Sequence, residues 1–297
     1  MTPPALAGPL PRPIPPRADA PTTGTARNDA PRTGPPRTGT TPSGRLIAIA
    51  SGKGGVGKTW FAITLAHALA RSGRAVLLFD GDLGLANVDI QLGLAPGATP
   101  GHDLGAVLAG RTRLAAAVLR HPEGGFDILP GCSGSGVLAG LDPAALTPVL
   151  AALRAAAAAY DTVLLDLGAG LEGGVRTLAA SADTLLVLAT EEPTSLTDAY
   201  AVLKLHTADR PGGDARIVVN QASSPAAGAR TYATLRRAAL GFLQRDPPLA
   251  GVIRRDDRVR EAIRRQALLL TRHPGAAAAA DVEAIAASLC AGAAALL

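Results

Sequence analysis

The chain contains 297 residues, 47% of them hydrophobic and 18% charged, which is enough to bury one large core or two small ones. Its two cysteines, Cys132 and Cys290, form neither a C-x-x-C pair nor a disulfide framework, which fits a reduced cytoplasm and excludes a disulfide-stapled scaffold. No apolar run reaches the roughly 20 residues of a transmembrane helix, and a net charge of +5 is too small to indicate nucleic acid by itself.

Residues 1–44 differ in composition from the rest of the chain. They hold twelve of the 24 prolines, few large apolar side chains, and two copies of Pro-Arg-Thr-Gly at 31–34 and 36–39. Such a segment cannot bury enough surface to offset its ordering entropy, so we expect a disordered tail that acts as a linker or a proline-rich docking segment. Five Arg and two Asp give the tail a charge of +3, so residues 45–297 are expected to form one mildly basic domain.

The most informative stretch is 51–59, Ser-Gly-Lys-Gly-Gly-Val-Gly-Lys-Thr, which fits the pattern G-x-x-x-x-G-K-[ST]. It lies between an apolar, strand-like run at 46–50 and a helical pattern at 59–72. Between a strand and a helix, the N–H groups of a glycine-rich loop cradle a polyphosphate, and the positive end of the helix adds to the attraction. We expect Lys58 to reach the β- and γ-phosphates and the Thr59 hydroxyl to bind Mg²⁺.

Lysine usage supports this interpretation. The chain has 26 arginines and only three lysines, and two of the three, Lys53 and Lys58, lie in this loop. A compact, flexible ammonium group suits phosphate better than the planar guanidinium does at such a site. Because Lys58 already serves the phosphates of its own subunit, Lys53 is expected to reach the nucleotide of a partner subunit, as an arginine finger does in trans.

Strand-like and helical segments alternate along the rest of the chain. The strand-like runs are continuously apolar, as in strands that are covered on both faces. The alternation predicts an α/β fold, a doubly wound and mostly parallel sheet with helices on both faces. The expected strands are 46–50, 75–79, 126–129, 162–165, 184–189, 216–219 and 249–253. The expected helices are 59–72, 143–159, 195–207, 229–244 and 257–266.

Acids and amides follow three of the expected strands, at Asp80 and Asp82, at Asp166, and at Asn220. Ligands of doubly wound sheets bind beyond the carboxyl ends of the strands, where the glycine loop also lies. Asp166 ends a run of the Walker-B type, 161–166, and is expected to hold Mg²⁺ through a water molecule. Asp82 is expected to orient a water molecule for in-line attack.

In these residues the sequence resembles a known family, the MinD/ParA ATPases of the SIMIBI class of P-loop proteins. Residues 53–59 are similar to its deviant Walker A motif, Asp82 to its switch I aspartate and 166–170 to its switch II. Within the family the chain looks most like the flagellar number regulators of the FlhG/FleN branch. The stretches that carry this finer resemblance are 82–89, 128–131, 133–134 and 192–200.

The resemblance implies an ATP-dependent homodimer in which Lys53 crosses to the other subunit. It also implies slow, Mg²⁺-dependent ATP hydrolysis that controls flagellar number or placement, with a flagellar GTPase or basal-body protein as a further partner. The catalytic residues so implied are Lys53, Lys58 and Asp82. The ATP contacts are Gly52, Lys53, Gly54, Gly55, Val56, Gly57, Lys58, Thr59, Trp60 and, for adenine, Asn220. The magnesium ligands are Thr59 and, through water, Asp166.

Two surfaces leave alternatives open. The alanine-rich segment 277–297 is expected to be a helix packed on the domain, because it contains Asp281 and Glu283 but no Lys or Arg; recruitment to a membrane is the alternative. The arginine-rich run 254–265 is expected to be a solvated face. Its alternative is a ParA-like partitioning ATPase that binds DNA nonspecifically. An iron–sulfur reductase is a third class, disfavoured because Cys290 lies in the last helix, far from the expected site.

Overall fold

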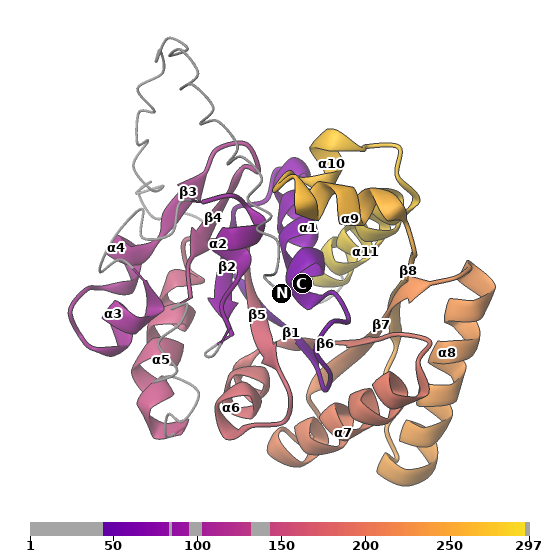
Figure 1. Cartoon of the computed structure of the whole chain (residues 1–297). Coiled ribbons are helices and arrows are strands. Elements are labelled where there is room, and N and C mark those ends of the chain that lie inside the picture. Colours follow the sequence, from indigo (N-terminus) through magenta and orange to yellow (C-terminus); the bar gives the residue numbers. More distant parts are fainter. Residues whose placement is uncertain (1–43, 83–84, 95–102, 132–142, 295–297) are drawn as a thin grey trace, which may run out of the picture. The chain divides into compact units, whose positions relative to one another are not determined.

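The computed structural model describes residues 44–82, 85–94, 103–131 and 143–294. An eight-stranded sheet runs through this part of the chain, in the order β3-β4-β2-β5-β1-β6-β7-β8 (Figure 1). Every neighbouring pair is parallel except β3 and β4 at one edge. The predicted class, a doubly wound and mostly parallel α/β sheet, is therefore confirmed.

The strands are β1 Arg45–Ser51, β2 Val76–Gly81, β3 Leu119–His121, β4 Phe126–Leu129, β5 Thr162–Ala169, β6 Thr184–Ala189, β7 Asp214–Ala222 and β8 Leu249–Arg254. The helices are α1 Lys58–Arg71, α2 Val88–Gln91, α3 Leu104–Leu108, α4 Leu114–Ala117, α5 Thr147–Ala156, α6 Gly173–Ser181, α7 Pro193–Asp209, α8 Pro225–Ala238, α9 Asp257–Arg264, α10 Leu269–Arg272 and α11 Ala277–Ala294. A 3₁₀ turn, η1 Pro143–Leu146, precedes α5, and a π-helical turn, η2 Ala239–Leu243, follows α8.

Helices cover both faces of the sheet, and each face has its own core. Successive strand residues point to opposite faces, so in β1 Leu46 and Ala48 belong to one core while Ile47 and Ile49 belong to the other. The first core is closed by α3 to α8, and the second by α1, α2, α9, α10 and α11 (Figure 1). Burial on both faces explains why these strands are continuously apolar.

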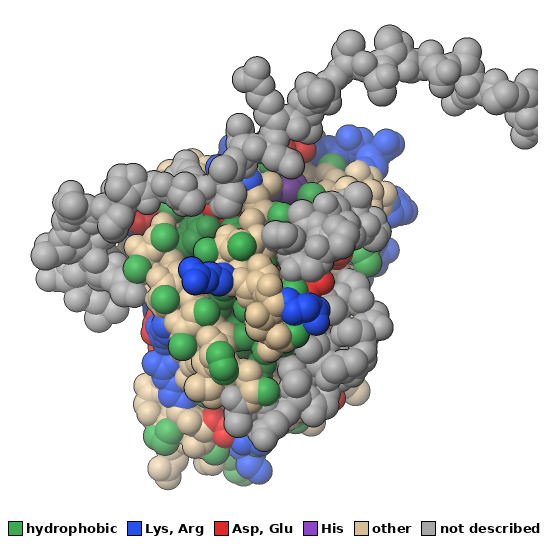
Figure 2. Space-filling view, turned by 90° about the vertical axis from the view of Figure 1, so that its left-hand side faces the viewer, with side chains coloured by type: hydrophobic (Ala, Val, Ile, Leu, Met, Phe, Trp, Pro, Cys, Tyr) green, Lys and Arg blue, Asp and Glu red, His purple; other side chains and the backbone are tan. Residues whose placement is uncertain are grey.

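The outer surface over α3, α4 and α5 is weakly charged. In the middle of this side, as Figure 2 shows it, apolar and uncharged side chains predominate, and groups of Lys and Arg side chains lie toward the edges of the view. Alanines such as Ala115, Ala116 and Ala155 account for much of the exposed apolar surface there. The basic charge of the chain is therefore not concentrated on this side.

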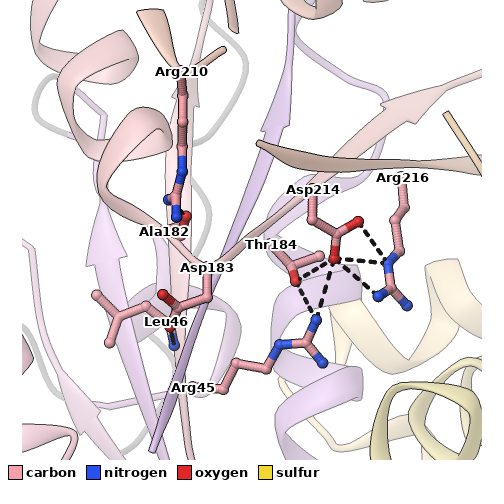
Figure 3. A network of polar contacts seen from close by, with 8 residues as sticks. All are labelled: Arg45, Leu46, Ala182, Asp183, Thr184, Arg210, Asp214 and Arg216. Carbon is pink, nitrogen blue, oxygen red and sulfur yellow. Dashed lines mark hydrogen bonds and ion pairs between the residues drawn. The ribbon is translucent and has the colours of Figure 1, made fainter. Parts of the chain in front are cut away.

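A polar network fixes the amino ends of the central strands (Figure 3). The carboxylate of Asp214, at the start of β7, accepts hydrogen bonds from Arg45 of β1 at 3.2 Å and from the Thr184 hydroxyl of β6 at 2.8 Å. Arg216 adds a further ion pair to Asp214 at 2.9 Å. These contacts hold the amino ends of β1, β6 and β7 together, and so help to align the carboxyl ends of the same strands.

The sequence did not predict one strand, β3, or five helices, α2, α3, α4, α6 and α10. Helix α6 begins with Gly173 and Gly174, which have poor helix propensity, and it exists because Val175 and Leu178 are buried on the sheet. Strand β3 has only three residues, which is too short to give a hydrophobic period. Each expected strand and helix is present, with ends that differ by a few residues from the predicted ones.

The C-terminal helix α11 packs on the domain, as we expected from its lack of Lys and Arg. Val282, Ile285 and Leu289 of α11 are buried in the core shared with α1. Among the described residues, no helix is long and apolar enough to cross a membrane. Residues 1–43 of the predicted disordered tail 1–44 lie outside the described residues, as does the stretch 133–134. Gly44, the last residue of the predicted tail, donates a backbone hydrogen bond to the Ala157 carbonyl at 2.8 Å.

Candidate nucleotide-binding site

The glycine-rich loop joins the carboxyl end of β1 to the first turn of α1. Gly55 and Gly57 have φ values of 79° and 90°, in the left-handed region that glycine adopts without strain. Gly57 is also the N-cap of α1, and no side chain caps the helix there. The uncapped N–H groups at the start of a helix form a ready anion site, so the geometry suits a phosphate group.

Side chains from the neighbouring strands hold this loop in shape through its carbonyl groups. The Asn220 amide donates to the Val56 carbonyl at 2.7 Å, and the Gln221 amide donates to the Gly55 carbonyl at 3.3 Å. A Cβ atom on Gly57 would lie only 2.6 Å from the Asn220 amide nitrogen, so glycine is required there for space as well as for φ. The Asn220 amide thus braces the loop, and its predicted contact with adenine stays a prediction.

Lys58 is buried at the start of α1 and is only 9% exposed. Burial lowers the pKa of its ammonium group, and the carboxylates of Asp166 and Asp82 act in the opposite direction. A buried cation is stable only with anionic partners. The charges of Asp166 and Asp82 therefore offset part of the cost of burying the Lys58 ammonium group.

Asp80 and Asp166 lie side by side at the carboxyl ends of β2 and β5, where they are register partners. Burial raises the pKa of Asp166 to about 8, with a further contribution from Asp80, while a hydrogen bond with Thr59 and the charge of Lys58 lower it. Burial likewise raises the pKa of Asp80 to about 7. Two buried carboxyl groups on neighbouring strands favour either protonation of one of them or the binding of a cation nearby.

The Thr59 hydroxyl and the Asp166 carboxylate supply the kind of oxygen ligands that a magnesium ion prefers. One carboxylate oxygen of Asp166, Oδ1, is buried without a hydrogen-bond partner among the described residues. Mg²⁺ prefers oxygen ligands and is usually held by one or two protein groups together with substrate phosphates and water. This agrees with the finding that no cluster of three His, Cys, Asp or Glu side chains in the described part of the chain could hold a metal by itself.

Asp80 and Asp82 have different roles in the loop that follows β2. Asp80 accepts backbone hydrogen bonds from Asn87 and Val88, both at 3.0 Å, and so braces the loop. Asp82 accepts a hydrogen bond from the backbone of Leu85 at 2.9 Å, and its carboxylate faces Gly168, where a Cβ atom would lie 3.3 Å away. The structure thus brings Asp82 to the end of β5, close enough to Lys58 for their charges to interact.

Lys53 points away from the phosphate loop of its own chain. Its ammonium group forms an ion pair with Glu192 at 2.7 Å and donates a hydrogen bond to the Thr194 hydroxyl at 3.1 Å, both at the start of α7. Lys53 is 41% exposed, in contrast to Lys58. Sequence reasoning missed this pairing because 139 residues separate the two partners.

A cavity of about 300 Å³ opens beside the loop. It extends from the glycines to α9, and its lining includes Gly55, Gly57, Trp60, Asn220, Arg255 and Val259. The Arg254 guanidinium, which also borders it, is turned toward α11 and binds the Asp281 carboxylate at 2.7 and 2.8 Å. The space next to a phosphate loop is where the nucleoside of a bound nucleotide would lie.

The strand, the glycine loop and the buried acids at the neighbouring strand ends define the site of a P-loop nucleotide-binding protein. Residues 47–269 match the family described as the CobQ/CobB/MinD/ParA nucleotide binding domain. Because this match spans most of the chain, the protein belongs to that family.

Individual relatives agree with this assignment. The chain is 37% identical to the antiactivator FleN of Pseudomonas aeruginosa over 242 residues, which cover 82% of this chain and 85% of that protein. It is 30% identical to the flagellum site-determining protein YlxH of Helicobacter pylori over 66% of this chain and 64% of that protein. Among solved structures it is similar to the septum site-determining protein MinD of Pyrococcus horikoshii in complex with Mg-ADP, with a TM-score of 0.68, 28% identity, and coverage of 82% and 95%.

Proposed function

We propose that this protein is an ATP-binding and ATP-hydrolysing dimerisation switch that regulates the number or placement of flagella. The observation that carries the proposal is the divergence of the two loop lysines. Lys58 is buried among the acids of its own site, whereas Lys53 leaves the loop and pairs with Glu192. The similarity to FleN and YlxH, whose names denote an antiactivator and a flagellum site-determining protein, supports the flagellar role.

In this proposal the loop N–H groups and Lys58 bind the β- and γ-phosphates of ATP. Thr59 and, through a water molecule, Asp166 hold Mg²⁺. When bound, Mg²⁺ neutralises charge on the phosphate oxygens and polarises the phosphorus that is attacked. Binding of ATP and Mg²⁺ favours the ionised form of Asp166, so part of the binding free energy is used to remove its proton.

Asp82 is the residue that we assign to the attacking water. Two observations support this: its carboxylate is next to Gly168 at the end of β5, and its charge acts on Lys58. From there it accepts a hydrogen bond from water and orients an oxygen lone pair toward the γ-phosphate. Because orientation alone gives modest acceleration, the expected turnover is slow, as befits a switch.

Lys53 is assigned to the partner subunit's nucleotide. The ion pair with Glu192 is exposed, and exposed ion pairs contribute little to stability, so the lysine can exchange a carboxylate for a triphosphate. The exchange couples ATP binding to dimerisation, because only the second subunit brings the phosphates within reach. A flagellar GTPase or basal-body protein that recognises the dimer is the proposed reader of the switch.

The experiment compares Lys53→Ala with Lys204→Ala, which removes an exposed lysine of α7 as a matched control. Both substitutions are placed in an Asp82→Ala background that slows hydrolysis, and size-exclusion chromatography is run with Mg·ATP and with Mg·ADP. We expect the Lys204 variant to dimerise with ATP and the Lys53 variant to bind ATP as a monomer. ATP-dependent dimers of the Lys53 variant would remove its role in trans.

The flagellar role is tested in the source organism. Deleting the gene should change the number or the position of flagella, counted by electron microscopy. Complementation with the wild-type gene should restore the normal pattern, and complementation with the Lys53→Ala gene should not. Unchanged flagellation after deletion would leave the ATPase assignment intact and remove the flagellar one.

A further inference from the structure

Arg255 directly follows β8 and lies between the nucleotide cavity and the start of α7. Its backbone N–H donates to the carbonyl of Ala222, at the end of β7, at 2.8 Å, and its side chain lines the cavity beside the glycine loop. The next residue of β7's loop, Ser223, donates to the Glu191 carboxylate at 2.7 Å from its backbone and at 3.0 Å from its hydroxyl. These contacts bring the ends of β7 and β8 next to the residues that open α7.

The guanidinium group of Arg255 is exposed and has no hydrogen-bond or ion-pair partner among the described residues. The charged residues on either side of it are engaged, because Arg254 pairs with Asp281 at 2.7 Å and Asp256 pairs with Arg258 at 2.9 Å. Of the three arginines at 254–258, Arg255 is therefore the one that can take a new partner without giving one up.

Glu192, the N-cap of α7, is influenced by two cations. Its hydrogen bond with Lys53 and the charge of that lysine lower the pKa of the Glu192 carboxyl, and the charge of Arg255 lowers it further. The lysine makes the direct contact, at 2.7 Å, and the arginine acts from a greater distance. If Lys53 leaves, Arg255 is the cation that remains near this carboxylate.

Transfer of Lys53 to a partner subunit's nucleotide would leave Glu192 without its present ion pair. In the monomer this costs little, because water solvates the exposed carboxylate. In the dimer the carboxylate would lie within the reach of one lysine side chain from a triphosphate, in an interface that excludes part of the water. Two anions so placed repel each other, and an unpaired charge in an interface is costly. A second cation at Glu192 is therefore needed most when the dimer forms.

We propose that Arg255 replaces Lys53 as the partner of Glu192 when Lys53 turns to the nucleotide of the partner subunit, which makes Arg255 a positioning residue of the dimerisation switch. The inference rests on the proposed function. A guanidinium group suits this role because it can bind a carboxylate through two N–H groups at once. Because Arg255 also borders the nucleotide cavity, the replacement would connect the wall of that cavity to the start of α7.

The first test measures the dissociation constant of the dimer by sedimentation velocity. The full chain is used in the Asp82→Ala background at saturating Mg·ATP, so that nucleotide affinity does not limit the result. We expect Arg255→Gln to raise the dissociation constant about fivefold, and Arg255→Lys, which keeps the charge, to restore most of the loss. Equal weakening by the two substitutions would show that the charge of Arg255 is not the cause, and would overturn the inference.

The second test repeats the measurement in a Glu192→Gln background. With no carboxylate to neutralise, Arg255→Gln should change the dissociation constant less than twofold there. Arg260→Gln is the matched control, because Arg260 lines the same cavity; whatever effect it has should be the same with and without Glu192→Gln. A fivefold effect of Arg255→Gln that persists in the Glu192→Gln background overturns the inference.

The outcomes separate this inference from the function on which it rests. A chain with Asp82→Ala that binds ATP and stays monomeric removes the proposed dimerisation switch and the inference together. An ATP-dependent dimer that is unaffected by Arg255→Gln removes only the inference. Loss of folding is not expected to obscure the result, since Arg255 is exposed and every variant keeps the backbone hydrogen bond to Ala222.

Discussion

At the scale of single residues, burial of charge gives the site its character. Asp166 is 1% exposed, and burial together with Asp80 raises its pKa to about 8. Without nucleotide, the folded chain therefore holds a proton between about pH 4 and pH 8 that the unfolded chain has released. Stability falls as the pH rises through this window, and the full destabilisation is present above pH 8.

The substitution Asp166→Asn tests this directly. The amide carries no charge, so the nucleotide-free variant should be more stable than the wild type at pH 9, by on the order of 2 kcal/mol, with a smaller difference at pH 6. Urea unfolding at the two pH values measures the difference. The same variant should lose the part of its ATP affinity that depends on Mg²⁺. A variant less stable than the wild type at pH 9 would contradict the buried charge as the cause.

For His67 we expect the opposite dependence, in which the free energy of unfolding rises with pH in the acid range. It is buried in α1, and burial, followed by the charges of Arg71 and His121, lowers its pKa to about 4. Between about pH 6.5 and pH 4 the unfolded chain binds a proton that the folded chain does not, so stability falls as the pH falls. His67→Gln should reduce this loss by about 2 kcal/mol, measured as the unfolding free energy at pH 7 and pH 5. An unchanged slope would assign the loss to other groups.

At the scale of elements, the wall of the nucleotide cavity is tied to the C-terminal helix. The Arg254 backbone N–H and guanidinium both donate to Asp281 of α11, at 2.9 and 2.8 Å. The Asp256 carboxylate accepts a hydrogen bond from the backbone of Ala277, at the start of α11, at 2.9 Å. Arg254 therefore braces the wall of the cavity against α11.

The substitution Asp281→Asn should loosen that wall. We expect it to lower the melting temperature by about 2–4 °C and to speed amide exchange in both α11 and the segment between β8 and α9. Glu283→Gln is the matched control, because Glu283 is also on α11 but pairs with Arg71 in a half-exposed ion pair at 3.2 Å. Equal effects of the two substitutions would show that α11 and the cavity wall are not coupled through Asp281.

At the scale of the whole molecule, the distribution of charge bears on what the proposed ATP-bound dimer would recognise. Two arginines of the run 254–265 are held by acids of the same chain, whereas Arg255 and Arg260 border the nucleotide cavity. Arg254 and Arg258 are engaged with Asp281 and Asp256, and the side with α3 to α5 is weakly charged (Figure 2). Nonspecific DNA binding needs many cations that are free to contact phosphates. This distribution favours a protein partner over DNA.

The Asp82→Ala dimer gives the corresponding prediction. In Mg·ATP it should persist on size-exclusion chromatography, because hydrolysis no longer resets the switch, and it should not retain nonspecific DNA at about 0.15 M salt. A filter-binding assay over a salt series measures retention. Strong, salt-sensitive retention would revive the partitioning alternative, and normal turnover of the variant would remove Asp82 from the water-positioning role.

The sequence by itself determined the class of fold, the phosphate loop and the acids at the strand ends. These follow from local patterns, since a continuously apolar run becomes a buried strand and parallel strands bring their carboxyl ends to one edge. Only the tertiary structure decided that Lys53 pairs with Glu192, that Asn220 braces the loop, and that Arg254 binds α11. Each of these depends on residues far apart in the chain, whose approach is set by packing and not by spacing. Helix α6 belongs with them, because burial of Val175 and Leu178 overrides the poor helix propensity of its first residues.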